Sequence, residues 1–160
     1  MKQADKAVDL LFKYNLKIAS AESCTGGMIA SELVAYSGIS ELFGEGFVTY
    51  SNEAKEKNLG VKKETLDTVG AVSEETAAQM ALGARRAAGS DIGIATTGIA
   101  GPTGGTPEKP VGLVYIGCAY KDKVTVRKYN FKGNRYQIRL DAAKRAFDLI
   151  YDVITRDGPQ

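Results

Sequence analysis

Two kinds of apolar pattern alternate along the chain. Some stretches repeat apolar residues every three or four positions, which is typical of helices that cover a core with one face, and others are short continuous runs typical of buried strands. The early elements alternate between strand and helix, whereas the last two strands are joined only by Lys121-Asp122, as in a hairpin. Strands are predicted over 16–20, 46–50, 91–97, 111–120 and 123–131, and helices over 4–14, 25–36, 53–58, 74–88 and from Gly133 onward.

This order of elements predicts a single α/β domain over residues 1–160. Alternating strands and helices favour a parallel sheet covered on both faces, and a late hairpin adds antiparallel strands. The expected fold class is therefore a three-layer α/β/α sandwich with a mixed, mostly parallel sheet ending in a hairpin. The buried faces of the first and last helices are expected to carry Val8, Leu11 and Phe12, and Tyr136, Leu140, Ala143, Phe147, Ile150 and Ile154.

Composition and charge exclude several classes of function. The formal net charge is +2, acidic and basic residues are interspersed, and no basic-aromatic patch stands out, so nucleic acid is not an expected partner. No apolar stretch reaches the roughly 18 residues that span a bilayer, and residues 1–6 lack a signal-peptide pattern. Cys24 and Cys118 are too few for a disulfide framework. We therefore expect a cytoplasmic protein with no membrane partner.

The complete absence of histidine narrows the chemistry further. It excludes Ser-His-Asp and Cys-His arrangements as well as His-ligated zinc, and two cysteines cannot form a Cys₄ site. No metal and no cofactor is expected. If the chain carries out nucleophilic catalysis, its base must be Lys, Asp, Glu, Tyr or a bound water.

A glycine-rich turn follows the first predicted strand, with the sequence Ala21-Glu22-Ser23-Cys24-Thr25-Gly26-Gly27. In open α/β sheets, ligands bind outside the carboxyl ends of the strands. A helix that starts at such a turn presents unpaired N–H groups, which bind oxyanions and phosphates. Two other predicted strand ends, residues 49–55 and 96–102, are also dense in hydroxyls, glycine and charge.

In a chain without histidine, Ser23 and Lys55 are an attractive nucleophile and base. A lysine must be neutral to accept a proton. Burial and neighbouring groups lower the pKa of catalytic lysines from about 10.4 to roughly 7–8. Tyr50 would relay the proton or hold the lysine. The backbone N–H groups of the turn at 25–27, formed by Thr25, Gly26 and Gly27, would stabilise an oxyanion.

Each of these residues also has a structural interpretation. Ser23 could cap the second helix, Lys55 could be a solvated lysine on a helix surface, and Tyr50 could pack at the end of a strand. Cys24 could be the nucleophile or a small buried residue. Glu22 could be the buried partner of a cation or a surface residue, and the sequence does not decide between them.

Five motifs in the same order resemble those of the CinA C-terminal domain family, over residues 4 to 154. The resemblance implies nicotinamide-nucleotide amidase activity, in which the carboxamide of nicotinamide mononucleotide is hydrolysed to nicotinic acid mononucleotide and ammonia in pyridine nucleotide (NAD) recycling. The family is described as using a serine nucleophile and a lysine base without metal, and by motif position these roles fall on Ser23 and Lys55. The motifs lie at 21–27, 46–55, 70–74, 98–102 and 109–112.

The resemblance also bears on domains and substrate contacts. In many relatives this domain follows an N-terminal domain linked to ADP-ribose pyrophosphatase activity, and the chain is expected to match the stand-alone amidase form without that second activity. A nucleotide substrate needs anchors for its phosphate and ribose. The candidates are Thr97, Gly98, Gly101 and Thr103, on the strand end and loop after residue 96.

Two other functions compete with this hypothesis. The first is a non-catalytic nucleotide-binding and sensing module, because cradling a phosphate needs only backbone groups. The second is a general small-amide hydrolase with another substrate. For any of these, a homo-oligomer, expected as a dimer, would use the alanine-rich helix 74–88 and the apolar late strands.

Overall fold

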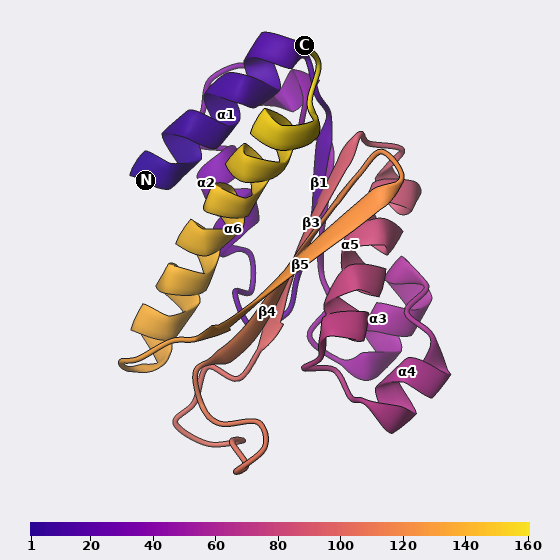
Figure 1. Ribbon diagram of the computed structural model, residues 1–160, viewed down its shortest axis with the longest axis vertical. Coiled ribbons are helices and arrows are strands. Elements are labelled where there is room, and N and C mark those ends of the chain that lie inside the picture. Colours follow the sequence, from indigo (N-terminus) through magenta and orange to yellow (C-terminus); the bar gives the residue numbers. More distant parts are fainter.

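The computed structural model describes residues 1–160 as one five-stranded sheet with helices on both faces (Figure 1). The strand order is β2-β1-β3-β4-β5. Helices α1, α2 and α6 cover one face, and α3, α4 and α5 lie on the other side (Figure 1). The strands are β1 (Ile18–Glu22), β2 (Glu45–Val48), β3 (Ile92–Gly98), β4 (Leu113–Tyr120) and β5 (Lys123–Asn130). The helices are α1 (Lys2–Tyr14), α2 (Met28–Leu33), α3 (Asn52–Leu59), α4 (Lys63–Thr68), α5 (Glu74–Ala88) and α6 (Arg135–Asp157), with a 3₁₀ turn at Ile39–Glu41.

The expected three-layer sandwich, with a mixed sheet that ends in a hairpin, is confirmed. Strand β1 pairs in parallel with β2 and β3, whereas β3 pairs antiparallel with β4, and β4 with β5. Four of the five strands, β1, β2, β3 and β5, therefore run in the same direction and only β4 opposes them, as expected for a mixed, mostly parallel sheet. Strand β4 runs opposite to β3 because the two are joined by a loop without a helix, so the chain returns directly alongside β3.

Several element boundaries differ from those predicted. The first strand continues to Glu22, so Ser23 follows it directly. The second helix begins at Met28, because Gly26 and Gly27 adopt positive φ angles of 57° and 107° in the preceding turn. The prediction that two aromatic residues lie on buried helix faces is wrong, because Phe12 is 42% exposed and Tyr136 is 61% exposed.

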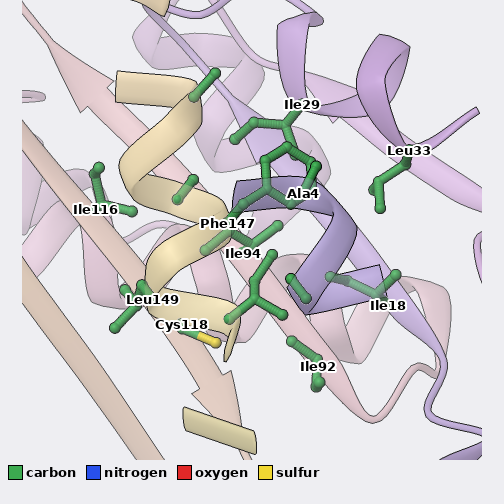
Figure 2. Close-up of a cluster of buried hydrophobic side chains, with 14 of the residues drawn as sticks. Ala4, Ile18, Ile29, Leu33, Ile92, Ile94, Ile116, Cys118, Phe147 and Leu149 are labelled. Carbon is green, nitrogen blue, oxygen red and sulfur yellow. The ribbon is translucent and has the colours of Figure 1, made fainter. Parts of the chain in front are cut away.

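The two helical layers bury different cores. The core beneath α1, α2 and α6 contains 27 buried residues, and Figure 2 shows Phe147 of α6 among Ile94, Ile116 and Ala4 from neighbouring elements. The core beneath α5 contains only 10 residues, mostly alanines, because α5 lies very close to the sheet. Burying large aliphatic and aromatic side chains stabilises the fold by about 1.5–3 kcal/mol each.

The alanine-rich face of α5 is used within the chain. Ala77, Ala81 and Ala84 are fully buried against the sheet, so this face is not available as the dimer surface expected from the sequence. The dimer itself stays a prediction. None of the six α-helices is both long and apolar enough to cross a membrane.

The close approach of α5 requires glycine at Gly93 of β3. A Cβ placed there would lie within overlap distance of the Ala81 carbonyl oxygen. We expect Gly93→Ala to lower the free energy of unfolding by about 1–3 kcal/mol, because overpacking forces backbone shifts. Gly44→Ala is the matched control, since a Cβ there meets nothing within 4 Å. Urea unfolding of both variants checks this, and equal midpoints would contradict it.

Candidate active site

A cavity of about 230 Å³ opens where β1 and β3 reach their carboxyl ends, beside the start of α3. A cavity of this size admits part or all of a small molecule and not a macromolecule. It brings together side chains from the segments that follow three strands and from the start of α6. The lining residues are Ser23, Cys24, Tyr50, Asn52, Lys55, Ala71, Val72, Thr97, Gly98, Ala100 and Arg135.

Ser23 is held at the end of β1 by its backbone. Its N–H donates to the Thr96 carbonyl of β3 at 3.0 Å, and its carbonyl accepts from Gly26 N–H at 3.1 Å. Its side chain is not the cap of α2, because that helix has no side-chain cap hydrogen bond from its own N-cap residue. The hydroxyl is therefore free to face the cavity.

Lys55 is buried inside the site, with only 1% of its surface exposed. It lies in the first turns of α3, which Ser51 caps by accepting from Ala54 N–H at 3.0 Å. Side chains on a helix tilt toward its N-terminus, and Lys55 Nζ reaches back to the Thr49 carbonyl at 2.8 Å and Ser23 Oγ at 3.2 Å. The alternative of a solvated surface lysine is thereby wrong.

The surroundings of Lys55 favour its neutral form. Burial lowers the pKa of the Lys55 ammonium below its ordinary value. None of the ion pairs in the chain involves this lysine, so no carboxylate restores the charged state. A neutral amine at 3.2 Å from Ser23 Oγ can accept the hydroxyl proton.

Cys24 lines the same cavity but is a poor nucleophile. It is 5% exposed, and burial raises the pKa of its thiol to about 12. Because the thiolate is the nucleophilic form, Cys24 stays protonated near neutral pH. Of the two alternatives for this residue, the small buried side chain fits the structure.

Glu22 has neither of the roles considered from the sequence. It is fully buried, and its carboxylate accepts from Thr25 Oγ1 at 2.6 Å, Ile29 N at 2.9 Å and Ala30 N at 3.1 Å. These partners are neutral donors at the start of α2, where the helix dipole favours an anion. Glu22 thus caps α2 from the end of β1 and fixes the turn that carries Ser23.

The turn after Ser23 leaves some of its backbone donors unpaired. Gly26 N–H is committed to the Ser23 carbonyl, but the N–H groups of Cys24, Thr25 and Gly27 donate to no backbone carbonyl. Cys24 and Thr25 directly follow Ser23. In hydrolases that use a serine on a strand-to-helix turn, the N–H after the nucleophile is an oxyanion donor.

Tyr50 and Arg135 lie at the mouth of the cavity. Tyr50 is 65% exposed, so it does not pack into the core. Arg135, at the start of α6, donates from Nη2 to Tyr50 Oη at 3.0 Å and from Nη1 to the Gly101 carbonyl at 2.7 Å. The pair therefore joins the segment after β2 to the loop after β3.

The residues predicted for the site fall into two groups. Ser23, Lys55, Tyr50, Thr97 and Gly98 line the cavity. The second group does not line it and consists of Thr25, Gly26, Gly27, Gly101 and Thr103.

Members of both groups also have defined structural contacts. Thr97 Oγ1 donates to the Ala71 carbonyl at 2.7 Å and so holds the segment before α5 against the site. Thr25 Oγ1 lies 2.8 Å from Thr96 Oγ1. Thr103 is exposed on the loop.

Arg135, Arg139 and Asn52 are site residues that sequence reasoning missed. Arg139 donates from Nε to the Cys24 carbonyl and from Nη2 to the Thr25 carbonyl, both at 3.0 Å. Asn52 lies inside the 46–55 motif and could have been found there. The two arginines had no local signal, because the turn of α6 that carries them contacts the site only through the tertiary fold.

A second, larger hollow is lined mainly by charged side chains. It has a volume of about 560 Å³ and lies at the opposite end of the sheet, between the end of α5 and the β4–β5 turn. Its charged lining residues are Arg85, Arg86, Lys121, Asp122 and Lys123, and the hydroxyl of its one serine, Ser90, donates to the Ile92 carbonyl. The chain also has no group of three or more His, Cys, Asp or Glu side chains placed to hold a metal ion.

The fold and the site define an α/β/α domain with a buried lysine against a serine at a strand end. Residues 1–154 match the model of the CinA C-terminal domain, and the chain belongs to this family. It is 58% identical over 143 residues to a CinA-like protein of Kosmotoga olearia, covering 89% of this chain and 35% of that one. It is 55% identical over 147 residues to a putative competence-damage inducible protein of Clostridium beijerinckii, covering 92% and 36%. The chain thus spans about a third of the length of these curated relatives.

Solved structures of the same superfamily share the fold over nearly the whole chain. A CinA superfamily protein of Klebsiella pneumoniae matches with a TM-score of 0.93 at 31% identity, covering 97% of both chains. A competence/damage inducible protein of Agrobacterium tumefaciens matches with a TM-score of 0.89 at 39% identity, covering 96% of both. The names of these relatives refer to competence and damage and state no reaction.

The lowered pKa of Lys55 predicts a pH-dependent change in stability. The unfolded chain binds the lysine proton up to about pH 10.4, whereas the folded chain releases it at a lower pH. Stability from this group is therefore depressed below the folded pKa and recovers as pH rises toward 10.4. We expect the free-energy difference between wild type and Lys55→Met to shift in favour of wild type between pH 7 and 10. Urea unfolding at several pH values checks this, and a constant difference would contradict it.

Proposed function

We propose that this domain is a nicotinamide-nucleotide amidase that hydrolyses nicotinamide mononucleotide to nicotinic acid mononucleotide and ammonia. The observation that carries the proposal is the buried amine of Lys55, 3.2 Å from Ser23 Oγ and without a carboxylate partner. Membership of the CinA C-terminal domain family supports the choice of reaction. A site that only bound nucleotides would hold a charged lysine against the phosphate, whereas burial lowers the pKa of Lys55 and favours its neutral form.

The reaction begins with proton transfer from Ser23 to Lys55. Neutral Lys55 takes the hydroxyl proton while Ser23 Oγ attacks the carboxamide carbon, and the carbonyl oxygen becomes an oxyanion. The unpaired N–H groups of Cys24 and Thr25 stabilise that charge. Gly26 N–H, which the sequence also suggested as an oxyanion donor, is not available because it donates to the Ser23 carbonyl.

The intermediate then collapses and the enzyme is regenerated. The Lys55 ammonium gives its proton to the amide nitrogen as the C–N bond breaks, so ammonia leaves and an ester to Ser23 remains. Lys55, neutral again, takes a proton from water, which attacks the ester and releases the acid. The proton returns to Ser23 Oγ, and the net reaction consumes one water.

The cavity also offers a partner for the nucleotide phosphate. Arg135 is the one lining cation other than Lys55, and guanidinium groups bind phosphate through paired hydrogen bonds. Its current partners, Tyr50 Oη and the Gly101 carbonyl, lie at the cavity mouth. Tyr50 was considered as a proton relay from the sequence. Its exposed position at the cavity mouth suits contact with the substrate better than proton transfer.

The first test is ammonia release from nicotinamide mononucleotide by the purified chain in the presence of chelator. Ser23→Ala is expected to lower kcat by at least about 10³-fold and Lys55→Met by about 10²–10⁴-fold. Ser31→Ala and Lys57→Ala, both exposed on nearby helices, are the matched controls and should keep the wild-type rate. Full activity of Ser23→Ala would remove the serine from the mechanism. Nucleotide binding without any ammonia release by wild type would instead identify a sensing module.

The second test concerns the substrate phosphate. Arg135→Ala is expected to raise KM for nicotinamide mononucleotide about tenfold or more, because a charge-assisted contact to a phosphate contributes about 1.5–3 kcal/mol. The much slower hydrolysis of free nicotinamide should be nearly unchanged in the same variant. Steady-state kinetics with both substrates measures this, and an equal loss for both would assign Arg135 a structural role.

A further inference from the structure

We propose that Arg139 is a positioning residue, which orients and polarises the peptide groups that stabilise the oxyanion at Ser23. The inference rests on the proposed serine hydrolysis and assigns a role to a side chain that does not line the cavity. Arg139 lies on α6, half-buried, 115 residues along the chain from the turn it contacts.

The guanidinium of Arg139 holds two consecutive carbonyl groups. Nε donates to the Cys24 carbonyl and Nη2 to the Thr25 carbonyl, each at 3.0 Å. A guanidinium presents its donors in a rigid plane, so two contacts from one fork fix the directions of both carbonyls. A Cβ at Gly26 would lie 3.2 Å from Nη2, so the glycine turn leaves room for this contact.

Each carbonyl belongs to a planar peptide unit that carries an N–H at its other end. The Cys24 carbonyl shares its unit with Thr25 N–H, which is unpaired. The Thr25 carbonyl shares its unit with Gly26 N–H, which donates to the Ser23 carbonyl at 3.1 Å. The Ser23 carbonyl in turn shares its unit with Cys24 N–H, which is also unpaired.

Both unpaired donors therefore lie at the end of a hydrogen-bonded path that starts at Arg139. Hydrogen bonds in such a path polarise one another, by about 10–30% per bond. A positive charge on the carbonyl side makes the N–H side a stronger donor. The same contacts set the donor directions before the reaction begins, so no reorganisation is needed when the oxyanion forms.

The test measures the reaction of Ser23 with a fluorophosphonate probe, which requires no nucleotide. Ser23 Oγ attacks phosphorus, fluoride leaves, the serine proton passes to Lys55, and the phosphoryl oxygen occupies the position of the oxyanion. Intact-mass measurements on the purified chain give the labelling rate. The variants are Arg139→Ala and Arg139→Lys, with Arg145→Ala as the matched control from the exposed side of α6.

We expect Arg139→Ala and Arg139→Lys to label about 10- to 100-fold more slowly than wild type, somewhat less than the loss of one oxyanion donor outright. Arg145→Ala should label within about twofold of wild type, as surface changes are usually small. Added guanidinium ion should restore part of the rate of Arg139→Ala. The thermal midpoint of Arg139→Ala is measured with and without guanidinium. If Arg139 had only a structural role, guanidinium would not raise the labelling rate of Arg139→Ala at an unchanged thermal midpoint.

Several results would overturn the inference. One is wild-type labelling of both Arg139 variants, and another is slow labelling that guanidinium does not restore. If Arg139→Ala fails to fold, a wild-type rate for Arg139→Lys would also contradict the inference, because an ammonium lacks the rigid planar fork that fixes the directions of both carbonyls. Absence of labelling in wild type would show that Ser23 has no working oxyanion site. Dependence on Arg139 without ammonia release from nicotinamide mononucleotide would retain the inference and reject the proposed substrate.

Discussion

Lys55 keeps its amine against Ser23 with the Thr49 carbonyl as its other partner, and a buried cation without a carboxylate is costly to maintain. Burial lowers the pKa of Lys55 and so favours the neutral amine, which avoids the cost of a buried charge. The neutral form is also the only one that can take a proton from serine. Burial thus supplies the reactivity that a histidine would supply in other hydrolases, in a chain that has none.

The turn that carries Ser23 is held by one neighbouring and one distant side chain. Glu22 fixes the start of α2 by accepting two backbone N–H groups and the Thr25 hydroxyl. Arg139 holds the other side of the same turn through two carbonyls. An acidic side chain binds the donors and a basic one binds the acceptors, so the peptide groups around Ser23 are fixed from both directions.

The sheet topology determines where this site forms. From β1 the chain moves to β2 on one side, and β3 then pairs with β1 on the other, which leaves β1 between them. Loops on the two sides of such a strand diverge and open a crevice at its carboxyl end. Ser23 lies directly at that point, and α3 enters it with Lys55. The antiparallel half of the sheet adds the support on which α5 and α6 pack.

The amino-acid sequence alone was enough to predict the fold class, the strand end that carries Ser23 and the exclusion of any histidine-based mechanism. These follow from local periodicity and composition, which do not depend on packing. The burial of Lys55 is apparent only in the folded chain, because the sequence of α3 also fits a helix with an exposed lysine. The contacts of Arg135 and Arg139 also depend on the folded chain, because both residues lie on α6, more than a hundred residues after the turn. The partners of Glu22 are close in sequence, but only the geometry of the turn brings them to its carboxylate.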